Sequence, residues 1–387
     1  MKFDVLVVGA GLAGAAFAAA LRGSSLKIGI VEARPPYRPS GWDPRIYAIS
    51  PSNVDFLTGI GIWPHLDTSR IAAVYDMEVH GDAGGRLDLS AYDCGLRELA
   101  WIVESSLMQQ ELWETVKRQH NVTLLCPAEP SALAMDDDAA RLTLADGRRL
   151  ETRLIVAADG RDSWVREAAG IDARNTPYGE KGVVANFRCE KPHQNTAFQW
   201  FRKDGILAYL PLPEQQMSMV WSAPDALADE LVSLSPAELC ARVAEAGGYR
   251  LGALELITPA AAFALRLMRV ETVVRPRLAL IGDAAHAIHP LSGHGINLGY
   301  QDARVLAEQL ATLPAWRDPG ELSILRAYAR ARAEETALLQ YTTHGLNRLF
   351  KPADPLLSGL RNFGLNLTNR LPVVRNALMR YAIAGRF

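Results

Sequence analysis

The sequence predicts a mixed α/β (α+β) fold in which a parallel-sheet lobe is interrupted by an antiparallel β-sheet lobe and followed by C-terminal helices. Two glycine-rich segments, VVGAGLAG at 7–14 and GDAAHAIHPLSGHGINLG at 282–299, each follow or contain a short apolar run that is typical of a buried strand. Between about 175 and 270 the pattern changes to alternating, aromatic-rich segments, which favour antiparallel strands. We therefore expect a first lobe over 1–174, an inserted sheet lobe over 175–270, a return to the first lobe over 271–350 and a helical tail over 351–387.

The first glycine-rich segment has the local context of a dinucleotide-binding turn. Residues 3–8 are typical of a buried strand, and the alanine-rich stretch 12–21 is typical of a helix. Gly9 permits a sharp turn out of the strand, Gly11 lets the backbone approach a pyrophosphate, and Gly14 lets the helix and strand pack closely. The helix N-terminus then faces the negative charge of the ligand.

An acidic residue stands where a Rossmann-like lobe needs one. Residues 27–31 predict the next strand, and Glu32 ends it, at the position where a carboxylate holds an adenosine ribose hydroxyl. A Gly/Ala-rich helix that only packs is the alternative, whereas Asp4 and the interrupting glycines exclude a signal peptide or membrane span over 5–21. The dinucleotide-binding residues expected in this region are Gly9, Gly11, Leu12, Ala13, Gly14, Glu32, Ala33 and Arg34.

Composition excludes several classes of protein. The 387 residues are 49% hydrophobic and 22% charged, which allows a large core, and the net charge of −2 argues against a nucleic-acid-binding surface. The four cysteines are far apart and form no CxxC pair, so neither a zinc site nor a disulfide framework is indicated. We expect a soluble cytoplasmic protein with reduced cysteines.

The remainder of the first lobe is predicted from periodicity. Residues 101–119 have the spacing of an amphipathic helix, and 122–126, 140–144 and 154–158 have the character of strands. The last strand ends in the turn ADGR at 158–161, where a second loop would reach the dinucleotide.

The inserted lobe is expected to be an antiparallel sheet that forms one wall of a cavity over a cofactor. Its aromatic side chains Trp200, Tyr209 and Trp221 are candidates for lining a substrate pocket, although aromatic residues on strands also commonly form core. A helix is expected over 236–246 with Ser235 as its N-cap. The expected strands are 183–189, 197–201, 206–211 and 217–221.

The chain is expected to return to the first lobe through a strand at 277–281, which Gly282 and Asp283 end. A helix over 295–310 and a long helical region over 321–349 follow. The tail over 351–387 has apolar and Arg side chains that suit either a membrane-surface helix or a packed C-terminal helix, and we favour the packed helix.

Three motifs in one order, GAGLAG at 9–14, AADGRDSWVR at 157–166 and the segment at 282–299, resemble the single-component FAD-dependent aromatic hydroxylases, the group A flavoprotein monooxygenases. The resemblance covers nearly the whole chain. The HPxxGxGxNLG portion of the third motif, together with DPRIYAIS at 43–50, is similar to the ubiquinone-biosynthesis hydroxylase (UbiH-like) branch. The resemblance implies a p-hydroxybenzoate-hydroxylase-like fold and FAD as the cofactor.

The resemblance also implies positions for residues around the flavin. Asp159 and Gly160 would lie close to the dinucleotide, Asp283 would hydrogen-bond the ribityl chain, and residues 290–297 would approach the isoalloxazine. The further cofactor-binding residues that it implies are Arg45, Gln109, Asp159, Gly160, Gly282, Asp283, Pro290, Gly293, Gly295, Ile296 and Asn297.

In such enzymes the flavin carries the reaction, because its reduced form reacts with O₂ to give a C4a-hydroperoxide that attacks an electron-rich ring. The protein must supply backbone N–H groups near the flavin N1–C2=O region and a dry pocket. The run 293–297, with two glycines, suits the first task. A second complete dinucleotide fingerprint is missing from the sequence, so NAD(P)H would bind transiently as the reductant.

No catalytic side chain is certain. The candidates are His286, His289, His294 and Pro290, of which Pro290 would shape the loop beside the ring. His294 departs from the family, which usually has Gln there; it could tune the flavin or simply face solvent. His286 more plausibly orders backbone than acts as a base, and the histidines lack the carboxylate spacing of a metal site.

The leading interpretation is a hydroxylase of a polyprenylated phenol in ubiquinone biosynthesis, with O₂ as co-substrate. Such a substrate implies transient peripheral contact with the inner face of a membrane, and a complex of ubiquinone-biosynthesis enzymes is a possible partner. A hydroxylase of a soluble aromatic acid is an alternative in which Arg202 or Arg266 would bind the carboxylate. A flavin halogenase is disfavoured because WxWxIP is missing, and a non-catalytic prenyl-binding protein is disfavoured by the retained Asp283.

Overall fold

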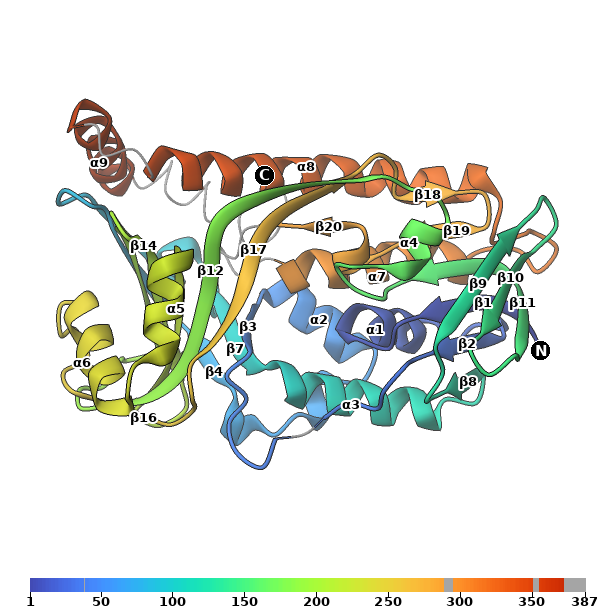
Figure 1. The fold of residues 1–387 in the computed structure, drawn as a ribbon, viewed down its shortest axis with the longest axis horizontal. Helices are drawn as coiled ribbons and strands as arrows, with labels where there is room; N and C mark the ends of the chain where they lie inside the picture. The colour runs from blue at the N-terminus through green and yellow to red at the C-terminus, as the bar shows by residue number, and fades with distance from the viewer. Residues whose placement is uncertain (38, 289–294, 351–354, 372–387) are drawn as a thin grey trace.

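The computed structural model describes residues 1–37, 39–288, 295–350 and 355–371. Two sheets lie at opposite ends of an elongated body, and α8 (Leu322–Phe350) runs along the top of both (Figure 1). The first sheet contains the N-terminal strand, whereas the second is built mainly from the middle of the chain. The structure thus has two large sheets from different parts of the chain, and the expected lobe boundaries remain a prediction.

The first sheet has the parallel core that the sequence predicts. β1 pairs in parallel with β2 and β11, and β11 pairs in parallel with β19, so the strand expected from the late part of the chain returns beside the first one. The strands, in their order across the sheet, are β18 (Val274–Arg275), β19 (Leu278–Leu280), β11 (Arg149–Ala157), β1 (Lys2–Val8), β2 (Ile28–Val31) and β8 (Val122–Leu125), with β10 (Ala140–Leu144) and β9 (Pro130–Met135) added antiparallel at one side.

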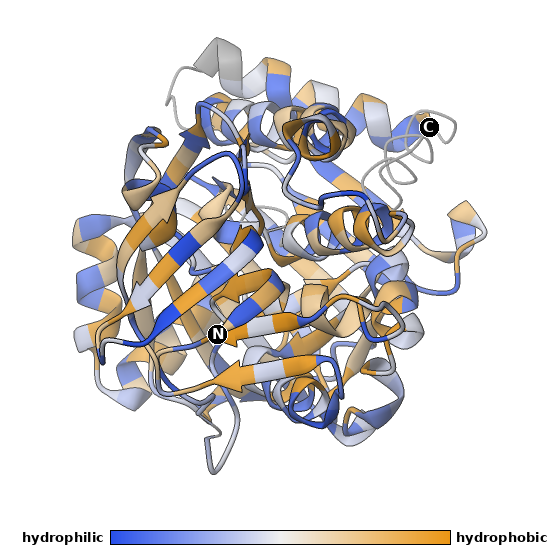
Figure 2. Ribbon diagram, turned by 90° about the vertical axis from the view of Figure 1, so that its right-hand side faces the viewer, coloured by the Kyte–Doolittle hydropathy of each residue, from blue (hydrophilic) through white to orange (hydrophobic). Residues whose placement is uncertain are grey.

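Both faces of this sheet are covered, which is why its strands are nearly continuous apolar runs. Val5 and Val7 of β1 pack in one cluster beneath α1 (Leu12–Ala20), α3 (Ser105–Arg118) and α7 (Gly295–Ala311). Leu6 and Val8 pack in the opposite cluster with β10 and α4 (Trp164–Ala168). Figure 2, seen from this end of the molecule, shows apolar segments gathered around the N-terminal strand.

The second sheet is largely antiparallel, as predicted. Its longest strand, β12, pairs along most of its length with β17, and the two run together between the halves of the molecule (Figure 1). The strands, in their order across the sheet, are β20 (His286–Ala287), β17 (Ala261–Val270), β12 (Ala173–Cys189), β15 (Gln216–Pro224), β14 (Gly205–Leu212), β13 (Thr196–Arg202), β5 (Asp76–His80) and β6 (Arg86–Ser90), with β16 (Leu254–Leu256) paired to β12.

Two features differ from the expectation. β5 and β6 belong to the second sheet although they fall within 1–174, because β5 pairs in parallel with β13, which lies far along the chain. The helix expected over 101–119 begins only at Ser105, because Ala100–Glu104 forms β7 of a small third sheet with β3 (Ile46–Ile49) and β4 (Ala72–Val74). Local periodicity does not reveal either pairing.

The remaining helices support the sheets. Ser235 caps α6 (Pro236–Ala246) in a capping box with Glu238, which confirms the predicted N-cap. In the described residues we find no helix that is long and apolar enough to cross a membrane. The other helical segments are α2 (Pro51–Gly59), α5 (Asp225–Ser233), α9 (Pro355–Arg370) and the short 3₁₀ turns Trp63–His65, Thr68–Arg70, Tyr92–Cys94 and Gly282–Ala284.

Candidate cofactor site and active-site wall

The first glycine turn contains two glycines that packing requires and one that it leaves open. A Cβ at Gly9 would lie 2.4 Å from the Ala158 carbonyl oxygen, and a Cβ at Gly14 would lie 2.1 Å from the carbonyl oxygen of Gly9. Gly9 also has a φ of +99°, which L-residues rarely adopt. Around the Cβ position of Gly11, the N-cap of α1, the described residues place nothing within 4 Å. The open side of Gly11 is therefore where a phosphate can approach the helix N-terminus.

Glu32 lies beside this turn, as predicted for a ribose ligand. One carboxylate oxygen accepts a hydrogen bond from the Ala10 N–H at 2.6 Å and the other accepts one from the Arg34 N–H at 3.2 Å. Each oxygen has a second lone pair, so the carboxylate can still accept from a ligand hydroxyl. Gln109 of α3 donates to the Ala10 carbonyl at 3.3 Å, which joins α3 to the same turn.

The first and third glycine-rich motifs meet at Ala13. Its Cβ lies 3.1 Å from the Cβ position of Gly282 and 3.4 Å from that of Gly299. Asp283 is the exposed residue of the 3₁₀ turn at this junction, between the buried Gly282 and Ala284. Leu12 is buried in the cluster below, whereas Ala33 is half-buried and Arg34 is exposed. Segments about 270 residues apart in the sequence therefore form one surface, and Asp283 stands on it.

The turn at 158–161 also touches the first glycine turn, because Ala158 donates its N–H to Val8 and packs against Gly9. The Asp159 carboxylate accepts hydrogen bonds from the Ser163 hydroxyl at 2.5 Å and the Val165 N–H at 3.0 Å, and burial raises its pKa. Asp159 thus orders the start of α4. Gly160, with a φ of +87° and no described atom within 4 Å of its Cβ position, is the open point of the turn.

The loop before β3 is held by Asp43 and presents Arg45. The Asp43 carboxylate accepts from the N–H groups of Arg45 at 2.9 Å and Ser106 at 3.0 Å. Among the described residues the exposed Arg45 guanidinium has no ion-pair partner. Burial and the Asp283 carboxylate raise the pKa of Tyr47, and Arg45 opposes them, so Arg45 and Asp283 both lie near the Tyr47 ring.

Asn297 uses its side chain to anchor the start of α7. Its Oδ1 accepts from the Ser50 N–H and from Asn53 Nδ2, both at 2.9 Å, and its Nδ2 donates to the Ala48 carbonyl at 2.8 Å. Ile296, half-buried, packs against the core below α7. Among the described residues no atom lies within 4 Å of the Gly295 Cβ position.

Four candidate residues, His289, Pro290, Gly293 and His294, lie outside the described residues. His286 is buried, and its Nε2 lies 2.7 Å from Asp302 Oδ2. Burial lowers the pKa of His286, but Asp302 outweighs burial and raises it overall. The same Asp302 oxygen accepts the Gly282 N–H at 3.0 Å. This position supports the backbone-ordering role expected for His286 rather than catalysis.

Sequence reasoning missed a charged group beneath the Gly282 turn, formed by His286, Asp302 and Arg332. Arg332 of α8 donates to Asp302 Oδ1 at 2.8 Å and forms a second ion pair with Glu335. Asp302 is 1% exposed and Arg332 is 5% exposed, so each charge depends on the other. The signal available in the sequence was Asp302 itself, an acid on the apolar face of the helix expected over 295–310.

Of the three aromatic candidates for the substrate pocket, Tyr209 and Trp221 are buried in the core, and Trp200 packs half-buried against the same cluster. Trp200, Tyr209 and Trp221 lie on the face of the second sheet that α5 and α6 cover. The Tyr209 hydroxyl donates to the Val243 carbonyl of α6, and Trp221 is fully buried. Side chains alternate across a strand, and these three positions share the helix-covered face, so the packing argues against the expectation that they line a pocket.

The opposite face of this sheet turns toward the cofactor loops. Asn186, Ser218 and Leu210 form one row across it, and Leu210 packs in the cluster that contains Ile46 of β3. Asn186 donates to the Asp43 carbonyl at 3.0 Å, which ties this face to the loop that presents Arg45. The row has polar and apolar side chains but no charge, so it is the candidate active-site wall.

Both arginines proposed to bind a substrate carboxylate already have acidic partners. Arg202 pairs with Asp204 at 2.7 Å and has its guanidinium 5.4 Å from the Trp221 ring, on the helix-covered face. Arg266 forms an ion pair with Asp162. Because both guanidinium groups are already paired with carboxylates, neither Arg202 nor Arg266 supports the alternative of a soluble-acid hydroxylase.

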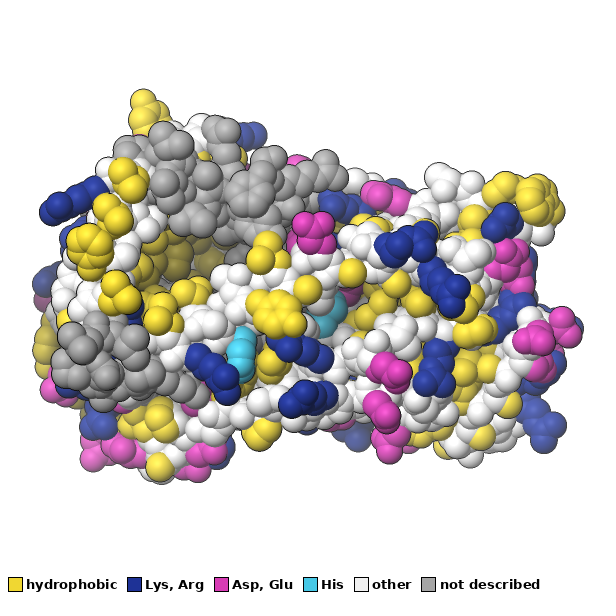
Figure 3. Space-filling model, turned by 90° about the horizontal axis from the view of Figure 1, so that it is seen from above, with side chains coloured by type: hydrophobic (Ala, Val, Ile, Leu, Met, Phe, Trp, Pro, Cys, Tyr) yellow, Lys and Arg dark blue, Asp and Glu magenta, His cyan; other side chains and the backbone are white. Residues whose placement is uncertain are grey.

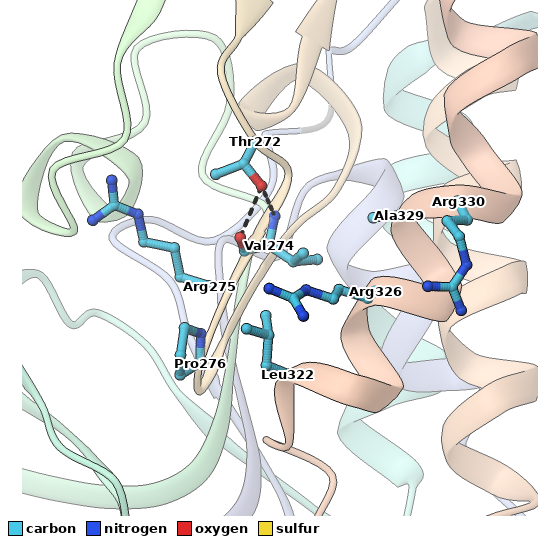
Figure 4. A pocket seen from close by; sticks show the side chains of 8 residues that line it. All are labelled: Thr272, Val274, Arg275, Pro276, Leu322, Arg326, Ala329 and Arg330. Atoms are coloured by element: carbon cyan, nitrogen blue, oxygen red, sulfur yellow. Dashed lines mark hydrogen bonds between the residues drawn. The ribbon is translucent and has the colours of Figure 1, made fainter.

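A surface hollow of about 390 Å³ lies elsewhere, between β18 and α8 (Figure 4). The Arg275 side chain points away from the other lining residues and donates to the Gly170 carbonyl at 2.8 Å. None of the expected cofactor or substrate residues lines this hollow, and no group of three potential metal ligands occurs in the described part of the chain. The hollow is not the candidate site.

These observations fit an FAD molecule held at the two glycine-rich motifs. The open side of Gly11, the Glu32 carboxylate and the exposed Asp283 are suited to the pyrophosphate, the adenosine ribose and the ribityl chain respectively. When bound, FAD supplies the redox and oxygen-activating chemistry. The protein supplies the residues that bind the cofactor, the helix N-termini and the uncharged row of the second sheet.

Comparison with known proteins agrees with this geometry. Residues 2–340 match the model of the FAD binding domain family. The chain is 33% identical over 384 residues to the ubiquinone hydroxylase UbiL of Rhodospirillum rubrum, which covers 98% of this chain and 89% of the relative. It is 31% identical to the 3-demethoxyubiquinol 3-hydroxylase of Escherichia coli, with 98% of each chain covered.

Among solved structures, p-nitrophenol 4-monooxygenase PnpA from Pseudomonas putida superposes with a TM-score of 0.80 at 19% identity, covering 98% of this chain and 97% of that one. This likeness shows that the two proteins share a fold. The match to the FAD binding domain family over residues 2–340 and the near full-length similarity to the curated relatives establish the family. The chain belongs to the FAD-dependent monooxygenases, in the group that contains the ubiquinone hydroxylases.

Proposed function

We propose that this enzyme hydroxylates the ring of a polyprenylated phenol in ubiquinone biosynthesis, with O₂ as co-substrate and NAD(P)H as a transient reductant. The observation that carries the proposal is the near full-length similarity to the ubiquinone hydroxylases. The uncharged row of Asn186, Ser218 and Leu210 supports it, because an uncharged phenol needs no buried counter-ion.

The residues of the chain have separate tasks in this function. Glu32 and the turn around Gly11 bind the adenosine and pyrophosphate end of FAD, and Asp283 holds the ribityl chain. Asn297 fixes the N-terminus of α7 against β3 and α2, so that the partial positive charge of the helix points to the flavin end of the site. The second sheet excludes water from the ring of the substrate.

A lipid-dissolved substrate also implies peripheral contact with the inner face of a membrane. The part of the expected tail that the structure describes is the helix α9, which is compatible with such contact. The soluble-acid alternative is weaker because Arg202 and Arg266 are paired with Asp204 and Asp162.

A turnover experiment tests the proposal. The FAD-loaded enzyme is incubated under ¹⁸O₂ with a short-chain prenylated phenol and either NADH or NADPH, and the products are analysed by mass spectrometry. We expect one ¹⁸O atom per product molecule, with one reductant preferred. Asp283→Ala should bind FAD more weakly and serves as the cofactor-deficient control. Hydroxylation of 4-hydroxybenzoate with no turnover of the prenylated phenol would contradict the proposal.

A further inference from the structure

The C-terminal helix α9 is attached to the protein through its polar side chains. Asn362, Asn366 and Asn369 each accept a hydrogen bond, at 2.8–3.0 Å, from backbone N–H groups of β6 or the turn before it. These three positions recur every three to four residues, so they form one face of the helix. That face satisfies the backbone of the β5–β6 hairpin, an edge of the second sheet.

An ion pair strengthens the same attachment. Arg361 of α9 is bonded to Asp82 in the β5–β6 turn, and it also donates to the Leu349 carbonyl of α8 at 2.7 Å. The hydrogen bonds from Arg361 hold the pKa of Asp82 at about 2. Arg361 and Asn362 are both buried. The inward side of α9 is therefore mainly polar and charged, with Leu365 as an apolar contact to the second sheet.

The outward side of α9 is apolar. Leu360, Phe363, Leu367 and Leu371 are 67%, 63%, 45% and 44% exposed. Their spacing of i, i+3, i+7 and i+11 places them in one stripe along the helix and its end. A helix on a water-facing surface normally has the reverse arrangement, with apolar side chains inward and polar ones outward. The amphipathic pattern of α9 is thus inverted.

The neighbouring half of α8 continues this apolar surface. Leu338, Tyr341, Leu346 and Leu349 are exposed on its outer side, although Asn347 on the inner side is buried. Of the sixteen large hydrophobic side chains exposed in the described residues, eight lie between Leu338 and Leu371, so exposure is concentrated there. Figure 3, seen from above, shows hydrophobic side chains with arginines between them over these helices.

The charged side chains of α9 have one sign. Residues Pro355–Arg370 contain two arginines and no aspartate or glutamate. Arg348 and Arg370, at the ends of α8 and α9, are exposed. An apolar stripe flanked by arginines complements the hydrocarbon and the anionic headgroups of a bilayer. A symmetric dimer through this face would bring the arginines of both copies together.

We propose that α9 and the outer side of residues 338–349 form a lipid-docking surface, in which Leu360, Phe363 and Leu367 enter the headgroup boundary of an anionic bilayer while Arg348 and Arg370 contact lipid phosphates. The choice of a lipid occupant rests on the proposed function, which requires a membrane-dissolved substrate. Since Phe350 and Leu365 pack against Phe201 and Ile206 of the second sheet, docking brings the active-site wall close to the bilayer.

Flotation with vesicles tests the surface on the full-length, FAD-loaded enzyme. Vesicles of phosphatidylglycerol and phosphatidylethanolamine are compared with vesicles of phosphatidylcholine. We expect binding to the anionic vesicles, about tenfold or more weaker in Leu360→Ser/Phe363→Ser/Leu367→Ser. Arg348→Gln/Arg370→Gln should lose the preference for anionic lipid. Trp316→Ser, which removes a 79% exposed ring elsewhere, is the matched control and should bind normally.

A second readout follows insertion directly. In Phe363→Trp, vesicles should shift the new tryptophan emission to shorter wavelength and brominated lipid should quench it, relative to Tyr92→Trp at a distant exposed site. Equal vesicle binding by the triple-serine variant and the parent would overturn the proposal. The proposal would also be overturned if the parent formed a dimer that the triple-serine variant does not form, and if the parent did not bind vesicles. FAD content and turnover of a soluble short-chain phenol should stay unchanged in every variant. If the proposed function is wrong, the parent itself will not turn over the phenol, and this result is independent of the vesicle assay.

Discussion

The two sheets differ in how directly their sequence features report their roles. In the first sheet, Gly9, Gly11 and Gly14 act through backbone geometry, and the structure places them where their spacing predicts. In the second sheet the large aromatic residues mislead, because Tyr209 and Trp221 are conspicuous in the sequence and yet fill the core under α5 and α6. A turn is specified by adjacent residues, whereas a pocket wall depends on which sheet face the helices cover.

The largest effect should come from the charged group under the Gly282 turn. Asp302→Asn leaves Arg332 and His286 without their common buried counter-charge, so we expect a loss of about 3–5 kcal/mol in the free energy of unfolding and poor FAD retention. Urea unfolding and the bound-flavin absorbance measure both. Asp204→Asn, at a half-buried ion pair of the second sheet that solvent still reaches, is the control and should change stability by about 1 kcal/mol or less. Equal losses of unfolding free energy in the two variants would show that the buried group at Asp302 contributes no more to stability than the ion pair at Asp204.

This charged group also shows where sequence-based prediction ends. The strand–turn–helix at the N-terminus, Glu32 and the Ser235 cap were predictable because each depends on a few neighbouring residues. The pairing of β5 with β13 and the contact between Asp302 and Arg332 were not, because each joins segments that only the tertiary fold brings together. The inverted polarity of α9 was likewise visible only once the β5–β6 hairpin was seen to bind its asparagines.

Tyr209→Phe tests whether this residue of the second sheet contributes to stability or to substrate binding. It removes the hydrogen bond to the Val243 carbonyl, which still accepts one from the Gly247 N–H, so we expect a loss of about 0.5–1.5 kcal/mol in stability. KM for the aromatic substrate should stay unchanged, because the ring faces α6. Thermal unfolding and steady-state kinetics separate the two effects. A raised KM with unchanged stability would return Tyr209 to the substrate pocket.

The smallest expected effect is a pH dependence of stability that comes from His286 of β20. Asp302 raises the pKa of buried His286 in the folded state above its unfolded value near 6.5. The stabilisation from the charged imidazole is then fully present below about pH 6.5 and is lost as pH rises through the folded pKa. The free energy of unfolding between pH 6 and 9 should fall more steeply in the parent than in His286→Gln. Identical slopes would show that His286 does not gain a proton on folding.

We infer that FAD binds at the open side of the first glycine turn. Flavin titration of the apoprotein measures this binding directly. Gly11 and Gly23 both have Cβ positions without described atoms within 4 Å, so valine at either site should leave the melting temperature of the apoprotein nearly unchanged. We predict that Gly11→Val raises the Kd for FAD by about tenfold or more, since its side chain fills the phosphate approach, while Gly23→Val binds normally. Equal FAD affinity in the two variants would contradict the account.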